Sequence, residues 1–90
     1  MNWKRDFEEK FGCLVNAGTG GPIIGASVAR TYVKIDVIKG NVPSLEAIEL
    51  FFRNLIEGHA RIVILNKGVE FGTLIRWPGG DWHVKQHLPS

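Results

Sequence analysis

Residues 60–88 read ARIVILNKGVEFGTLIRWPGGDWHVKQHL, and their apolar pattern is that of consecutive β-strands joined by short turns. The run ARIVIL is almost continuously apolar, which is typical of a strand buried at the centre of a sheet. NKG supplies a turn, and VEFGTLIRW and DWHVKQHL have the pattern of hairpin arms around PGG. The segment therefore predicts a C-terminal β-meander.

The turn of this hairpin sets its predicted register. A two-residue turn at Gly79 and Gly80 would fix the strand pairing. The pairs expected on one, apolar face are Trp77–Trp82, Ile75–Val84 and Phe71–Leu88. The pairs expected on the other face are Arg76–His83, Leu74–Lys85 and Gly72–His87. The hairpin should thus present an apolar inner face and a basic outer face.

Upstream of the meander, residues 44–57 carry the clearest helical pattern. Ser44 is a good N-cap, and Glu46 falls in the first turn, where the helix dipole favours an acidic side chain. Gly58 supplies the C-terminal stop. The apolar stripe consists of Leu45, Ile48, Phe52 and Leu55. We expect this stripe to cover the apolar side of the sheet.

The N-terminal half completes the expected fold. Trp3, Phe7 and Phe11 recur every four residues and predict a helix over about residues 3–11. CLVN (13–16) is a short strand candidate, and the chain favours extended structure from Ile23 to Ile38. Residues 1–90 should therefore form a single α+β domain. Its one mostly antiparallel sheet contains the meander (60–88), with two helices (about 3–11 and 44–57) packed on one face.

The composition is that of a small globular protein. The chain has 90 residues, 44% of them hydrophobic, and a formal net charge of +2, which is low for a dedicated nucleic-acid binder. Cys13 is the single cysteine, so no internal disulfide can form and we expect a reducing, cytoplasmic location. Neither a signal peptide nor a membrane-spanning run is expected, because no sufficiently long apolar segment occurs.

The segment GGPIIGAS (20–27) differs by one residue from a phosphate-binding loop. Gly20, Gly25 and Ser27 fit the pattern, but Ala26 stands where the lysine is required. We therefore expect a turn that joins two strands, and no cofactor. The alternative is a half-size doubly wound unit with strands at 13–17, 32–38 and 61–65 and helices at 22–30 and 44–57. In that unit the Gly18–Gly25 loop would bind a nucleotide.

No other group of residues has catalytic or metal-binding spacing. His83 and His87 could share a metal on a helix, but on a strand they would stand roughly 13 Å apart. Cys13 has no histidine placed beside it by a motif, so it is expected to be a small buried apolar residue. We therefore expect no metal site and predict that the protein is not an enzyme.

The candidate partner-binding residues gather in and around the hairpin. They are Arg76, His83, Lys85, His87, Trp77, Trp82 and Arg61. The leading hypothesis is a small non-enzymatic regulator that docks on a protein partner, as phage and mobile-element inhibitors do. The alternative is a nucleic-acid-binding regulator that uses the basic face, which is disfavoured because the tryptophans are expected on the opposite face. Two further interpretations are that the basic face is simply solvated, and that the protein forms a homodimer at a free sheet edge.

Overall fold

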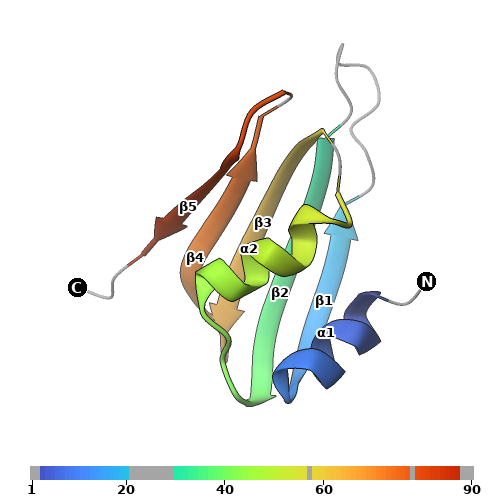
Figure 1. Ribbon diagram of the computed structural model, residues 1–90. Coiled ribbons are helices and arrows are strands. Elements are labelled where there is room, and N and C mark those ends of the chain that lie inside the picture. Colours follow the sequence, from blue (N-terminus) through green and yellow to red (C-terminus); the bar gives the residue numbers. More distant parts are fainter. Residues whose placement is uncertain (1–2, 21–29, 57, 78, 88–90) are drawn as a thin grey trace.

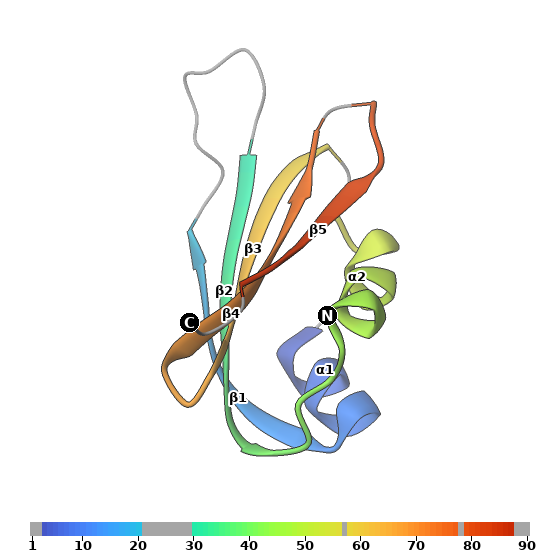
Figure 2. The same ribbon diagram turned by 90° about the vertical axis from the view of Figure 1, so that its left-hand side faces the viewer.

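The computed structural model describes residues 3–20, 30–56, 58–77 and 79–87. The elements, in chain order, are α1 (Trp3–Phe11), β1 (Cys13–Gly20), β2 (Arg30–Gly40), α2 (Leu45–Arg53), β3 (His59–Asn66), β4 (Val69–Arg76) and β5 (Trp82–Gln86). The strands form one five-stranded sheet in the order β1-β2-β3-β4-β5. Both helices lie on the same side of it (Figures 1 and 2). The predicted α+β fold with a C-terminal meander is confirmed.

The connection through α2 determines the topology of the sheet. β2 and β3 are parallel, and α2 carries the chain between them across one face (Figure 1). All other neighbouring strands are antiparallel. Because β1 and β2 are antiparallel, the alternative doubly wound unit is excluded. Gly18 and Gly20 belong to β1, whereas residues 21–29 of the glycine-rich segment lie outside the described residues.

The boundaries of α2 follow from local hydrogen bonding. The side chain of Ser44 accepts a hydrogen bond from the backbone N–H of Ala47 at 3.2 Å, as predicted for an N-cap. The helix ends at Arg53, before the predicted residue 57. The N–H groups of Leu55 and Ile56 both donate to the carbonyl of Phe52, so the chain tightens into a turn. Leu55 is consequently 37% exposed and does not continue the buried stripe.

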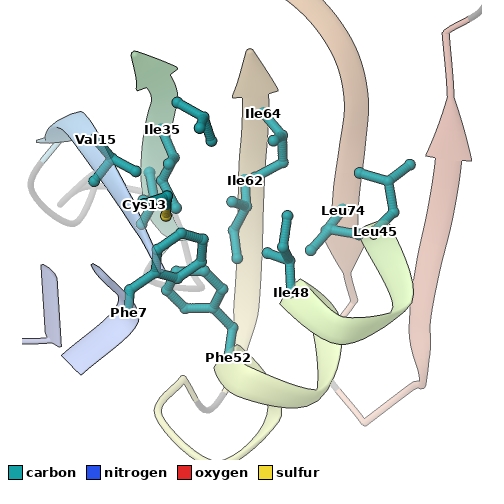
Figure 3. Packing of buried hydrophobic residues seen from close by; sticks show 12 residues of the cluster. Phe7, Cys13, Val15, Ile35, Leu45, Ile48, Phe52, Ile62, Ile64 and Leu74 are labelled. Carbon is teal, nitrogen blue, oxygen red and sulfur yellow. The ribbon is translucent and has the colours of Figure 1, made fainter. Parts of the chain in front are cut away.

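The hydrophobic core lies between the helices and the sheet (Figure 3). Phe7 of α1 and Phe52 of α2 are fully or almost fully buried, and their ring centroids are 6.2 Å apart. Trp3 makes an edge contact with Phe52 at 5.5 Å. Such aromatic pairs contribute about 0.5–1.5 kcal/mol beyond the area they bury. The helices therefore stabilise each other as well as the strands below them.

The register of the C-terminal hairpin differs by one residue from the prediction. Arg76 lies opposite Trp82, and Leu74 lies opposite Val84. The expected pairing of Trp77 with Trp82 is wrong, because β4 ends at Arg76 and a longer loop precedes Trp82. A shift of one residue exchanges the two faces of a strand. Leu74, expected on the basic face, is therefore fully buried in the core, and Arg76 lies on the helix side.

Candidate functional site

The sheet has a second face, which points away from α1 and α2 and is covered by neither helix (Figure 2). Strand pairing places residues in rows across this face, because directly paired residues share a face. We call this surface the open face and define it by two such rows. The first row is Tyr32, Arg61, Ile75 and His83. The second row is Lys34, Val63, Thr73 and Lys85.

The open face carries three exposed cations. Lys34, Arg61 and Lys85 are exposed, and none of them forms an ion pair with any residue in the described ranges. Acidic groups nearby have partners of their own. Asp36 accepts a hydrogen bond from the backbone N–H of Gly68 at 3.0 Å. The three cations are thus free to meet an external anion.

The carboxylate of Glu70 also has a partner within the protein. Its Oε1 lies 3.6 Å from Nε2 of His87, and the same imidazole nitrogen lies 3.0 Å from the hydroxyl of Thr73. His87 follows directly after β5, and its backbone N–H donates to the carbonyl of Phe71. Glu70, Thr73 and His87 therefore form a local polar cluster, and His87 is held by it.

A hollow of about 310 Å³ is lined by the β2, β3 and β4 members of the first row and by residues next to them. Its lining includes Tyr32, His59, Arg61, Ile75 and Trp77. The indole of Trp77 stacks on the imidazole of His59, with 4.9 Å between ring centroids and 24° between planes. Trp77 is nevertheless 53% exposed, so much of its other face remains accessible. The hollow thus combines aromatic rings with the guanidinium of Arg61.

Two of the predicted partner-binding residues lie on the other side of the sheet. Arg76 donates from Nη1 to the carbonyl oxygen of Ile56 at 2.6 Å. Its guanidinium carbon is 5.9 Å from the ring centroid of Trp82. Both side chains also contain a buried nitrogen, Nε of Arg76 and Nε1 of Trp82, without a hydrogen-bond partner among the described residues. Arg76 and Trp82 therefore belong to the packing between the hairpin and the end of α2.

The remaining predicted residues lie on the open face or at its ends. They are Arg61, Trp77, His83, Lys85 and His87. The prediction that both tryptophans share one face is wrong, because Trp77 lies on the open side and Trp82 on the helix side. Sequence reasoning did not select Tyr32, Lys34 or His59. The alternation along β2, which sets Lys34 against buried Val33, is the signal that could have found the lysine.

Cys13 has the properties of a core residue. Burial, with a smaller effect from the nearby carboxylate of Glu8, raises the pKa of the Cys13 thiol above its ordinary value. The thiol is therefore protonated at neutral pH, and a protonated thiol is a poor nucleophile. Within the described ranges, no three His, Cys, Asp or Glu side chains are grouped so that they could hold a metal ion.

Comparison of the chain with protein-family models, curated proteins and solved structures found no match. No helix within the described ranges is long and apolar enough to cross a membrane. A functional proposal for this protein therefore depends on the geometry of the open face.

Proposed function

We propose that this protein is a non-enzymatic binding protein whose open face docks on single-stranded nucleic acid. One observation carries the proposal: cations without an ion-pair partner among the described residues share a sheet face with accessible aromatic rings, and neither helix covers that face. Trp77 lines the same hollow as Arg61, so an aromatic ring lies on the same face as the cations, contrary to the sequence-based expectation. Open sheets with aromatic and basic side chains are a recurrent platform for single strands.

The spread of the cations favours an extended polyanion. Lys34 lies on β2 and Lys85 on β5, at opposite ends of one row. Neighbouring strands are about 4.8 Å apart, so these lysines originate from backbones about 14 Å apart. This spacing matches an anion that extends across several strands. A chain of phosphates running across the strands would contact them in turn, with Arg61 between them.

The aromatic rings favour a single strand over a duplex. Tyr32 and Trp77 offer ring faces on which an unpaired base can stack. Base–aromatic stacking contributes about 1–3 kcal/mol per base. In a duplex the faces of the bases are covered by their neighbours, and only phosphates and groove edges are accessible. A duplex would therefore engage the cations without the rings, and we expect it to bind more weakly.

The proposal is tested by the salt dependence of oligonucleotide binding. Fluorescence anisotropy would follow a labelled single-stranded RNA of mixed sequence, about 12 nucleotides long, within the usual site size of such platforms. Each phosphate contact contributes about 0.7 to the slope of log affinity against log salt for single strands. Three cations therefore predict a slope of about −2. The double variant Lys34→Ala with Lys85→Ala should reduce it to about −0.7.

The matched control removes the same charge from another surface. Lys4 and Lys10 are exposed on α1, on the helix side of the sheet. The variant Lys4→Ala with Lys10→Ala should keep the wild-type slope and affinity. Equal slopes for the two double variants would contradict the proposal. Binding of polyglutamate as tight as that of RNA would also contradict it, and would point to an acidic protein surface as the partner.

A further inference from the structure

We infer that the hollow beside Trp77 binds one unstacked nucleobase, while Arg61 holds the phosphate attached to it. The inference rests on the proposed function, and it assigns a nucleotide site within the open face. A ligand of this class has a planar heteroaromatic ring and a charged group close to it. The hollow offers both complementary features: aromatic rings, and a guanidinium at the same mouth.

The stacking of Trp77 on His59 prepares the ring for a ligand. The imidazole supports one face of the indole at a centroid distance of 4.9 Å, and His59 itself is buried. An exposed tryptophan without such support would lose side-chain freedom when it binds a base. Here the ring is already held by a contact within the protein, so less conformational entropy is lost on binding. The exposed face of the indole is therefore a preorganised stacking surface.

The size and lining of the hollow restrict its ligand. At about 310 Å³ it lies at the lower end of the range for small-molecule sites, which suits one ring system with its sugar. Ile75 adds an apolar side chain to the lining. Tyr32 pairs directly with Arg61 on neighbouring strands, and both side chains line the hollow. Stacking on a ring and pairing with a phosphate can therefore occur in one bound nucleotide.

The hollow near the start of α2 and the thiol of Cys13 are weaker candidates for a ligand site. The hollow near the start of α2 is lined by Ser44, Glu46 and Gln86 but contains no cation, aromatic pair or unpartnered buried group in its lining. Cys13 is buried and protonated at neutral pH. The aromatic hollow differs from both because it joins two complementary features for one class of ligand.

The experiment is a titration of the folded protein with nucleoside monophosphates, followed by NMR of backbone amides and tryptophan indole N–H groups. Adenosine and uridine monophosphates are the probes, and ribose 5-phosphate is the ligand control because it lacks the base. We expect saturable shifts at the Trp77 indole and at amides around Arg61. Ribose 5-phosphate should bind at least about fivefold more weakly, since it loses a base stack.

Variants separate stacking from general surface effects. Trp77→Ala should weaken nucleotide binding by about fivefold to a hundredfold, as expected for loss of one base–aromatic stack. Trp77→Phe should retain most of the affinity because it keeps a ring. Leu50→Ala is the matched control, because Leu50 is similarly exposed (56%) but lies on α2. Amide spectra of each variant would establish that it is folded.

The outcomes distinguish this inference from the proposed function. Equal affinity for nucleotides in the wild type and in Trp77→Ala would overturn the inference, and so would equal affinity for ribose 5-phosphate. If no nucleotide saturates while RNA binding still depends on Lys34 and Lys85, the inference is wrong and the proposed function stands. Nucleotide binding that requires Trp77, without lysine-dependent RNA binding, supports the nucleotide site and contradicts the wider proposal.

Discussion

Arg76 donates a 2.6 Å hydrogen bond from Nη1 to the carbonyl oxygen of Ile56, which lies in the segment after α2. The bond joins the end of β4 to the chain that enters β3. It also takes the guanidinium away from the open face. Arg76 is therefore a structural residue in a region where the sequence pattern predicts a binding residue.

Replacement of Arg76 should affect stability and leave nucleic-acid binding intact. A hydrogen bond that involves a charged group contributes about 1.5–3 kcal/mol, so Arg76→Ala should lower the free energy of unfolding by that amount. Urea denaturation would measure it. Lys85→Ala is the control, and its exposed side chain should change stability by less than about 0.5 kcal/mol while weakening RNA binding. A binding loss in folded Arg76→Ala equal to that in Lys85→Ala would contradict the assignment.

Gly72→Ala should destabilise the contact between the sheet and α2. A β-carbon at Gly72 would overlap both δ-carbons of Leu45, whose side chain is buried. Such overpacking typically costs about 1–3 kcal/mol. Gly18→Ala is the matched control, since a β-carbon there meets nothing within 4 Å and its φ is not positive. Thermal unfolding of the two variants should separate them, and equal midpoints would show that Leu45 can move away without loss.

Cys13 should make stability depend on pH in the alkaline range. Burial, and to a lesser extent Glu8, raise the pKa of its thiol above the ordinary 9.0, so the folded state retains the proton longer than the unfolded state. The stabilising contribution is complete below pH 9.0 and is lost as pH rises through the folded-state pKa.

Cys13→Ala should remove this alkaline loss. Because the thiol accounts for up to about 1.4 kcal/mol per pH unit, wild type should lose more stability than the variant above pH 9.0. Urea midpoints measured at successive pH values would show the difference between the two slopes. Parallel curves would mean that the thiol does not contribute.

Asp36→Asn should strengthen RNA binding. Asp36 follows Lys34 on the same face of β2, and its carboxylate repels a phosphate bound there. A charge roughly 8 Å from a phosphate contributes about 0.5 kcal/mol in water, or about twofold in affinity. Asparagine retains an oxygen that can accept the hydrogen bond from Gly68. Anisotropy at low salt should show the gain, and an unchanged affinity would place the phosphates elsewhere.

The candidate site was only partly predictable because it combines strands that are distant in the chain. The basic pattern of the C-terminal segment predicts Lys85 and Arg61 as binding residues. Tyr32 and Lys34 lie on β2, and they join the site because β2 pairs in parallel with β3. That pairing depends on α2 crossing the sheet, which no local pattern in β2 or β3 reveals.

The sequence by itself determined where the two helices and the C-terminal strands form, and it placed Phe7, Ile48 and Phe52 in the core. These features depend on local periodicity and capping, as at Ser44, where the side chain meets a backbone group three residues away. The sequence did not determine that α2 ends at Arg53, which leaves Leu55 exposed. Only the tertiary structure decided the hairpin register and hence which charges share a face. A one-residue shift changes little locally, but it decides whether Leu74 or Ile75 enters the core. The helices favour the observed register because it buries Leu74 beneath them. The same register places Gly72 under α2, where the absence of a side chain leaves room for Leu45.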